Sequence, residues 1–212
     1  MNKIAKIVRE ENFLSLTGNL VIAIFGISGF ALLTRSLSLE LFGQWVLFIT
    51  AGSFVEMFRF GITNTGLIRY LSGADDSDRV KLIGSNALIG LGATFLIAII
   101  LIVCTIIFKD AINNSGYSLF FKWYPLLAFL NLPWNNALVV LQADRKYGKI
   151  LAIKALNSGS FFIVLLINFY FLDLSLTHLI FVLLTINAFT SFITILAGWD
   201  GTKYITSATV ET

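Results

Sequence analysis

The apolar stretch Leu96-Ile-Ala-Ile-Ile-Leu-Ile-Val103 lies inside a longer segment, residues 83–108, that contains no Asp, Glu, Lys or Arg. Its hydrophobic residues do not alternate with polar ones, as they would along the strands of a transmembrane β-barrel. A helix needs roughly 20 predominantly apolar residues to cross the hydrocarbon core of a bilayer. The segment is long enough, and we predict that it forms a transmembrane helix.

The composition of the whole chain is that of an integral membrane protein. Of its 212 residues, 57% are hydrophobic and 13% are charged, and the mean hydropathy is +0.86. A water-soluble protein of this size needs a more polar surface. The first apolar segment, residues 13–33, is longer than the roughly 7–15 residues of a signal-peptide core, so we expect a retained first helix.

We predict an all-α integral membrane fold, a six-transmembrane-helix bundle. The apolar runs and the polar breaks between them place the helices at residues 14–34, 44–68, 83–108, 118–142, 150–172 and 176–198. Residues 1–13 are expected to form a cytoplasmic amphipathic N-terminus. Residues 199–212 are expected to form a cytoplasmic tail or a connection to a further lobe.

Basic residues are concentrated on one side of the predicted bundle, in the N-terminus, the second and fourth loops, the start of the fifth helix and the tail. They are Lys3, Lys6, Arg9, Arg69, Arg79, Lys81, Arg145, Lys146, Lys149, Lys154 and Lys203. The other side carries Arg35, Lys109 and Lys122. The positive-inside rule therefore predicts that both termini are cytoplasmic. The net charge of +3 follows from this topology and requires no nucleic-acid partner.

Two charged residues interrupt the apolar run Phe54-Val-Glu-Met-Phe-Arg-Phe-Gly-Ile-Thr-Asn-Thr-Gly66, near the centre of the second predicted helix. A charge that faces lipid at that depth costs about 2.5–3.5 kcal/mol per residue on insertion scales. At 100° per residue, one helical stripe contains both charges, and its members are Gly52, Glu56, Arg59, Thr63 and Gly66. We therefore expect this stripe to face the protein interior or an aqueous cavity.

The sequence leaves two interpretations of the charged pair open. In one, Glu56 and Arg59 neutralise one another at i,i+3 spacing and only hold helices together. In the other, Arg59 meets an anionic substrate, and Glu56 is its resting partner or a proton site. Both interpretations place the pair away from lipid.

The fourth predicted helix carries an uncharged polar stripe. Tyr124, Asn131, Asn135 and Gln142 lie within about 40° of one another on a helical wheel, and Pro133 is expected to kink the helix among them. Substrate binding and interhelical hydrogen bonding both explain such a stripe. The candidate substrate-binding residues are therefore Glu56, Arg59, Thr63, Tyr124, Asn131 and Asn135.

A stripe of small and weakly polar residues lies on the third predicted helix. It contains Asn86, Gly90 and Thr94. Such stripes are more often packing seams between helices than binding sites, and we interpret this one as a seam.

The sequence offers no set of residues for catalysis or metal binding. Apart from Glu56, the acidic residues lie in loops or termini, and the single His178 lies beside a short loop. The single Cys104 lies in an apolar segment and has no second cysteine to pair with. We therefore expect no enzymatic activity, no cofactor and no metal.

Several connections between the predicted helices have a distinctive sequence. The first helix ends in Leu33-Thr-Arg-Ser-Leu-Ser-Leu-Glu-Leu-Phe-Gly43, and the second ends in Arg59-Phe-Gly-Ile and Leu67-Ile-Arg-Tyr70. The fourth runs into the basic loop Leu141-Gln-Ala-Asp-Arg-Lys-Tyr147. Together these features resemble the N-terminal region of polysaccharide flippases, in the multidrug/oligosaccharidyl-lipid/polysaccharide exporter superfamily. The resemblance spans essentially the whole chain.

The resemblance implies a transporter that flips a polyprenyl-diphosphate-linked oligosaccharide across the bacterial inner membrane, by alternating access between two lobes. Members usually have about twelve to fourteen helices in two six-helix lobes, so this chain corresponds to the N-terminal lobe. Its partners would be the lipid-linked oligosaccharide, membrane lipids, and a second lobe on the same natural chain or on a homodimer partner. Arg59 would hold the anionic headgroup. Family members often carry an acidic residue where this chain has Arg59, so no role of that acid is transferred.

Two other functions are open from the sequence. One is a drug or small-solute exporter of the same superfamily, for which we expect an acidic cavity that accepts cations. A single glutamate, Glu56, paired with Arg59 agrees less well with such a cavity. A non-transport membrane scaffold subunit would use the polar stripes as dry seams between helices.

Overall fold

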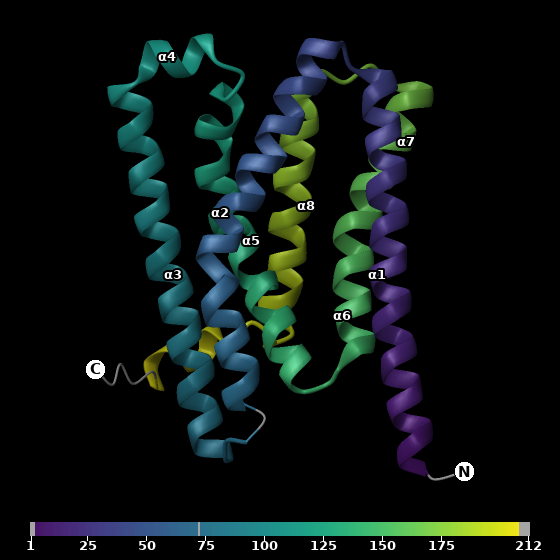
Figure 1. The fold of residues 1–212 in the computed structure, drawn as a ribbon, viewed down its shortest axis with the longest axis vertical. Coiled ribbons are helices and arrows are strands. Elements are labelled where there is room, and N and C mark those ends of the chain that lie inside the picture. The colour runs from purple at the N-terminus through teal and green to yellow at the C-terminus, as the bar shows by residue number, and fades with distance from the viewer. Residues whose placement is uncertain (1–2, 72, 208–212) are drawn as a thin grey trace.

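The computed structural model describes residues 3–71 and 73–207, with their side chains except those of residues 3–12, 14, 62, 63 and 207. In this part of the chain the regular secondary structure is helical, and six helices are long and apolar enough to span a membrane. The predicted all-α, six-helix membrane fold is confirmed. The helices run side by side, and the start of α1 and the segment after α8 lie at the same end of the bundle (Figure 1).

Five of the six spanning helices are single α-helices, and the remaining one, the fifth along the chain, is interrupted. The single helices are α1 Lys3–Ser36, α2 Leu39–Leu71, α3 Asp76–Ile107, α5 Ser118–Ala143 and α8 Leu176–Leu196. The interrupted span consists of α6 Tyr147–Lys154, the π-helical turn η1 Ala155–Gly159 and α7 Ser160–Phe171. Two short helices, α4 Lys109–Asn114 and η2 Thr202–Ser207, follow α3 and α8.

Three helices begin earlier than the apolar segments from which they were predicted. α1 begins at Lys3 rather than near residue 14, α2 at Leu39 rather than near residue 44, and α3 at Asp76 rather than near residue 83. Hydropathy marks only the part of a helix that fits the hydrocarbon core, whereas Lys, Arg and Glu have good helix propensity and continue the helix beyond it. The N-terminal segment is therefore continuous with the first spanning helix from Lys3 onward.

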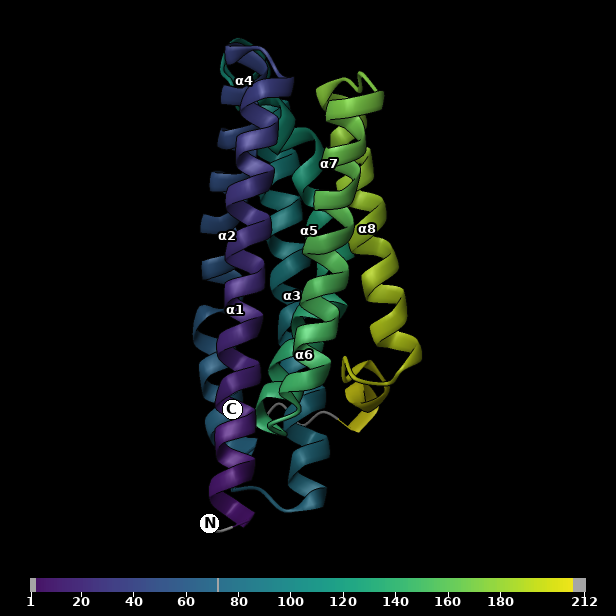
Figure 2. The same cartoon turned by 90° about the vertical axis from the view of Figure 1, so that its right-hand side faces the viewer.

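Helix α5 is at the centre of the bundle. It packs against α2, α3 and α8, and Figure 2 shows it between α2 and α8. Tyr124 and Ala128 of α5 pack with Phe48 of α2 and Leu179 of α8 in the main hydrophobic core. A side chain on α5 is therefore able to meet groups from several helices at once.

Helix α1 lies on the opposite side of the bundle from α3. It packs against α6, η1 and α7. In Figure 1, α1 lies beside α6 and α7, whereas α2, α3 and α5 form a second group. The rings of Phe30 on α1 and Phe42 on α2 meet edge to face, with their centres 4.9 Å apart. The two groups therefore touch near the α1–α2 connection.

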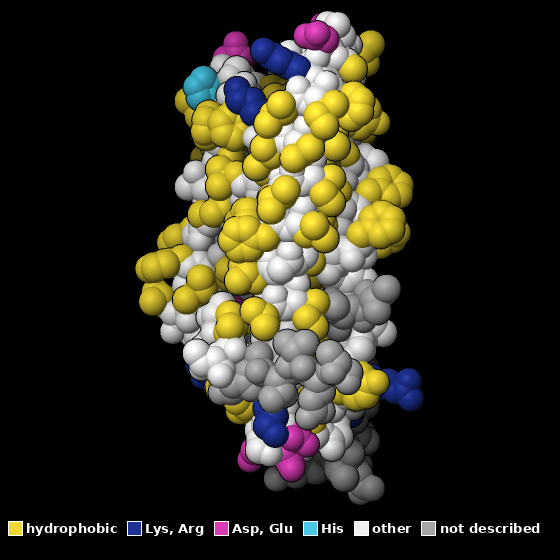
Figure 3. All heavy atoms as spheres, turned by 90° about the vertical axis from the view of Figure 1, so that its left-hand side faces the viewer, with side chains coloured by type: hydrophobic (Ala, Val, Ile, Leu, Met, Phe, Trp, Pro, Cys, Tyr) yellow, Lys and Arg dark blue, Asp and Glu magenta, His cyan; other side chains and the backbone are white. Residues whose placement is uncertain are grey.

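The outward face of α3 is strongly apolar. Phe95, Leu96, Ile99 and Ile100 are each about half exposed or more. On this side of the molecule, Figure 3 shows hydrophobic side chains spread over the middle and charged side chains gathered near the two ends. An apolar surface of this extent suits contact with lipid chains rather than with water.

Polar contacts connect α3 to the last residue of α2 and to the residues after α5, at the end of the bundle where α1 begins. Arg79 of α3 donates a 2.9 Å hydrogen bond to the carbonyl oxygen of Leu71 and forms an ion pair with Asp144, which follows α5. Lys146 also forms an ion pair with Asp144, with an N–O distance of 2.7 Å. Partial burial opposes ionisation of Asp144, but the hydrogen bonds and charges of Lys146 and Arg79 outweigh it and lower the pKa of this carboxyl.

The segment after α8 folds back onto α3. A Cβ atom at Gly84 of α3 would overlap the backbone carbonyl oxygen of Tyr204, so the close approach requires glycine. Gly201, at the turn before η2, has a φ of +80°, which glycine adopts without strain. The predicted C-terminal connection is therefore packed against the bundle as far as η2.

Candidate site at a buried ion pair

The charged pair of α2 lies inside the bundle. Arg59 Nη1 donates a hydrogen bond of 2.7 Å to Glu56 Oε1, one helical turn earlier. The side chain of Arg59 has no exposed surface, whereas that of Glu56 is 26% exposed. The pair therefore points into the protein, and Glu56 is the member that reaches the surface.

Arg59 is held by groups from three helices. Nη1 also donates to Asn131 Oδ1 at 3.1 Å, and Nη2 donates to Thr94 Oγ1 and to the carbonyl oxygen of Ala128, both at 2.7 Å. The guanidinium carbon lies 4.6 Å from the centre of the Phe60 ring, within the range of a cation–π interaction. Of the three guanidinium nitrogens, Nε is buried and has no hydrogen-bond partner within the part of the chain whose side chains the structure describes. The protein thus surrounds the guanidinium almost completely with acceptors.

One oxygen atom of Glu56 accepts all the hydrogen bonds that the described side chains donate to this carboxylate. Tyr124 Oη donates to Oε1 at 2.6 Å, and Asn131 Nδ2 donates to it at 2.9 Å, in addition to Arg59 Nη1. The other oxygen, Oε2, is buried and has no hydrogen-bond partner among the described residues. A buried acceptor without a partner is unfavourable, so a proton or a donor that arrives at Oε2 removes that cost.

Glycine and threonine residues allow the polar groups to approach one another. A Cβ atom at Gly52 would lie 3.0 Å from Tyr124 Cε2, so glycine leaves room for the phenol ring beside α2. The Thr94 hydroxyl donates its proton to the carbonyl oxygen of Gly90 at 2.6 Å, which leaves its lone pairs for Arg59. The local sequences of α2 and α3 therefore shape the site.

The structure brings four of the six candidate residues together: Glu56, Arg59, Tyr124 and Asn131. No hydrogen bond joins Asn135 to this network within the described side chains. Asn135 lies one turn further along α5 than Asn131, which places it beyond the charged pair. The side chain of Thr63 lies outside the described residues.

Two members of the network were not among the candidates. Thr94 belongs to the stripe that we interpreted as a packing seam, and its hydroxyl also binds Arg59. The signal that points to it is a hydroxyl group near the middle of a spanning helix, on a face that turns inward. Ala128 contributes a backbone carbonyl, for which an alanine side chain gives no signal.

No protein-family model, curated protein or solved structure matches this chain. The described residues contain no group of three or more His, Cys, Asp or Glu side chains that could hold a metal ion. The network itself joins a guanidinium, a carboxylate, a phenol, a carboxamide and a hydroxyl group.

Proposed function

We propose that this multi-pass membrane protein is a lobe of a transporter that moves a lipid-linked oligosaccharide across a membrane by alternating access. The observation that carries the proposal is Arg59, a guanidinium near the middle of a spanning helix, held by hydrogen bonds, by the ion pair with Glu56 and by the ring of Phe60. A guanidinium matches two phosphate oxygens at once. It therefore suits the diphosphate that joins such a glycan to its lipid carrier.

Glu56 provides a way to exchange partners at this site. In this structure Glu56 forms an ion pair with Arg59, and the side chain of Glu56 is partly exposed whereas that of Arg59 is not. A proton that binds to Glu56 weakens the ion pair, and the phosphate of the substrate then replaces the carboxylate as the partner of Arg59. Tyr124 and Asn131 are released from Glu56 in the same step and become donors for sugar hydroxyls.

The resemblance to polysaccharide flippases supports this function. The motifs that carry it lie at the α1–α2 connection, residues 33–43, in the C-terminal half of α2, and at the α5–α6 connection, residues 141–147. The second six-helix lobe, on the same natural chain or on a homodimer partner, completes the transport path in this proposal. The protein then lies in the bacterial inner membrane with both termini in the cytoplasm, and transports without catalysis.

A specific observation favours a structural role as the alternative. The side chain of Arg59 is fully buried, and its acceptors come from α2, α3 and α5. A network of this kind fixes three helices relative to one another without touching a substrate.

Transport by Arg59 variants tests the proposal. Arg59→Lys keeps the charge and loses the bidentate geometry, whereas Arg59→Gln loses both. At equal protein level, we expect export of the glycan to fall by about 10- to 100-fold in Arg59→Gln, as for the loss of a charged hydrogen bond, and by less in Arg59→Lys. Full export by Arg59→Gln would overturn the proposal.

Thiol labelling distinguishes the structural alternative. Glu56→Cys is made in a Cys104→Ser background, so that position 56 carries the single thiol. A transport path requires labelling by a membrane-impermeant reagent added from one side of the membrane. Absence of labelling from both sides, in folded protein, would support the structural role.

A further inference from the structure

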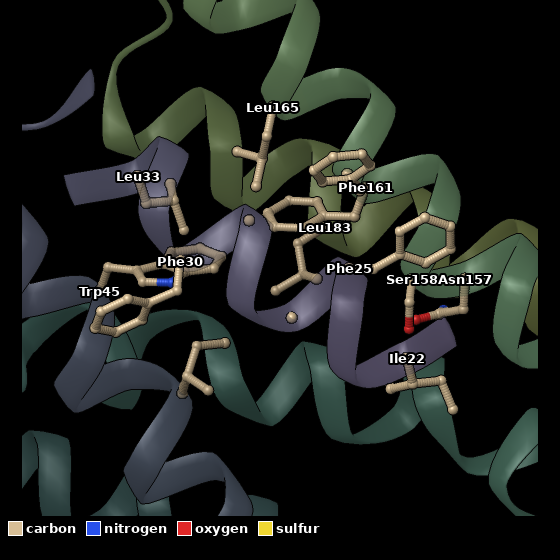
Figure 4. A pocket seen from close by; sticks show the side chains of 14 residues that line it. Ile22, Phe25, Phe30, Leu33, Trp45, Asn157, Ser158, Phe161, Leu165 and Leu183 are labelled. Atoms are coloured by element: carbon tan, nitrogen blue, oxygen red, sulfur yellow. The ribbon is translucent and has the colours of Figure 1, made fainter. Parts of the chain in front are cut away.

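A cavity of about 370 Å³ lies between α1, α2, α7 and α8. It shares no lining residue with the Arg59 network. Its volume is within the range of about 300–1,000 Å³ that ligand pockets occupy. Apart from the indole N–H of Trp45, the side chains of Asn157 and Ser158 and two glycines, the lining is aliphatic and aromatic (Figure 4).

The cavity is elongated along α1. Its lining on this helix extends from Ile22 to Leu33, which is roughly 16 Å at 1.5 Å per residue. This is about half of the ~30 Å hydrocarbon thickness of a bilayer. Figure 4 shows Ile22, Asn157 and Ser158 toward one end, and Leu33 with Trp45 toward the other. The cavity thus has a polar end and a longer apolar part.

Aromatic rings build its walls. Trp45 of α2 stacks on Phe161 of α7, with ring centres 5.6 Å apart and planes 8° from parallel. Phe25 of α1 stacks on Phe162 of α7, with ring centres 5.3 Å apart. These two stacks connect α7 to α1 and to α2, and the four rings line the cavity. An apolar occupant would make dispersion contacts with the faces of these rings.

The cavity opens on the surface of the bundle between α1 and α2. Phe30 and Ile49 line it and are 53% and 39% exposed. Gly26 also lines it, and a Cβ atom at this position would have no heavy atom within 4 Å. Because α1 and α2 are long and apolar enough to span a membrane, we expect the opening to face the hydrocarbon core.

The polar end comes from the interruption of the spanning segment α6–α7. Asn157 and Ser158 belong to η1, and π-helical turns inside α-helices occur frequently at functional sites. Asn157 Nδ2 donates a hydrogen bond of 3.3 Å to Thr190 Oγ1 of α8. The wide turn therefore places two neighbouring polar side chains at the same end of an otherwise apolar space.

We infer that this cavity binds a single hydrocarbon chain of a membrane lipid, which enters between α1 and α2. Such a chain is slender and apolar, and it therefore suits the longer, apolar part of the cavity between the aromatic stacks. The chain comes either from the isoprenoid tail of a lipid carrier or from a phospholipid. Assignment of the chain to an isoprenoid tail rests on the proposed function, whereas assignment to a phospholipid does not.

Photolabelling of the protein in lipid vesicles tests the inference. The vesicles contain phosphatidylethanolamine and phosphatidylglycerol with one of two probes, a polyprenyl phosphate or a phospholipid, each with a diazirine on its hydrocarbon chain. After irradiation, the labelled residues are mapped by mass spectrometry. We expect adducts on Leu165, which lines the cavity and is only 3% exposed, so that lipid on the outer surface of the bundle does not reach it.

A matched pair of glycine variants tests whether the label reaches Leu165 through the cavity. Gly26→Phe fills the space beside α1, and we expect it to abolish the adducts on Leu165. Gly92→Phe on α3 is the control, because a Cβ atom there also has no heavy atom within 4 Å and Gly92 does not line the cavity. We expect this control to leave the adducts unchanged. Thermal unfolding of both variants shows whether they fold.

Each outcome of the labelling supports or overturns the inference. Adducts on Leu165 from the polyprenyl probe assign the cavity to a carrier tail, and adducts from the phospholipid probe alone assign it to an acyl chain. Adducts from both probes confined to outward residues such as Ile99 would overturn the inference, whether or not the variants fold. Labelling does not depend on transport, and export by Arg59 variants does not depend on labelling, so the two proposals fail separately.

Discussion

The hydroxyl of Thr94 on α3 accepts a hydrogen bond of 2.7 Å from Arg59 Nη2 on α2, while it donates its own proton to the carbonyl oxygen of Gly90 at 2.6 Å. A hydroxyl has one proton, so toward the guanidinium it acts only as an acceptor. The position of Arg59 is therefore set by α3 and α5 as well as by its own helix. A movement that separates α2 from α3 has to break this contact.

Replacement of Thr94 by valine removes this acceptor and keeps the shape of the side chain. We expect Thr94→Val to lower the free energy of unfolding by about 1.5–3 kcal/mol, the range for hydrogen bonds to charged groups. Thr105→Val is the control, since the Thr105 hydroxyl on the same helix bonds to the carbonyl oxygen of Leu101. Unfolding in detergent micelles gives both values. Equal effects of the two substitutions would contradict the role of Thr94.

Neutralising Glu56 alone leaves a buried arginine without its counter-charge. We expect Glu56→Gln to destabilise the protein by about 3–5 kcal/mol, and a second change, Arg59→Gln, to restore most of the loss. The two amides keep hydrogen-bonding groups and remove both charges. The measurement is a double-mutant cycle of unfolding free energies.

An exposed ion pair serves as the comparison for this cycle. Asp78 and Lys81 on α3 have the same i,i+3 spacing, at an N–O distance of 3.7 Å, and both side chains are at least half exposed. We expect Asp78→Asn to change the stability by no more than about 1 kcal/mol. Additive effects of Glu56→Gln and Arg59→Gln would show that the buried pair is not coupled.

Alanine at Gly52 is expected to push the Tyr124 ring away from Glu56. The new Cβ atom would lie 3.0 Å from Tyr124 Cε2, and overpacking of this kind costs about 1–3 kcal/mol. Gly43→Ala on the same helix meets no heavy atom within 4 Å, so we expect it to be neutral or to stabilise the helix by up to about 1 kcal/mol. Thermal unfolding compares the two, and a Gly52→Ala protein as stable as Gly43→Ala would refute the packing account.

The ion pairs of Asp144 give the protein an acid-dependent contribution to stability. Lys146 and Arg79 lower the pKa of Asp144 below its ordinary value near 3.8 despite partial burial. A carboxyl with a lowered folded-state pKa stabilises the fold above the unfolded-state pKa, and this stabilisation is lost as the pH falls through the folded-state pKa. We expect wild type to be more stable than Asp144→Asn at pH 7 and the difference to shrink below about pH 4. A difference that is constant down to pH 2 would contradict this assignment.

The bundle itself could be predicted from the sequence, because apolar segments such as residues 83–108 are uncharged and long enough to span a membrane as helices. The i,i+3 spacing of Glu56 and Arg59 also predicts their ion pair. The i,i+7 spacing of Tyr124 and Asn131 places both on the face of α5 that meets the pair.

Other features depend on how the helices pack against one another, and the local sequence of one helix does not specify this packing. Asn135 shares the helical face of Asn131 but lies further along the axis of α5. A helical wheel shows the face of a residue and not its position along the axis. The Ala128 carbonyl became an acceptor only because α2 packs beside α5. The π-helical turn at Ala155–Gly159, with its cavity, has no distinctive hydropathy pattern.

Export of the glycan by the charge-free double variant Glu56→Gln/Arg59→Gln tests the central claim most directly, because the variant separates folding from transport. Its control is Asp78→Asn/Lys81→Gln, which neutralises the exposed pair on α3. We predict that the double variant folds with near-native thermal stability and loses export, while the control keeps it. Wild-type export by a folded Glu56→Gln/Arg59→Gln protein would contradict the claim that the charge of Arg59 serves transport.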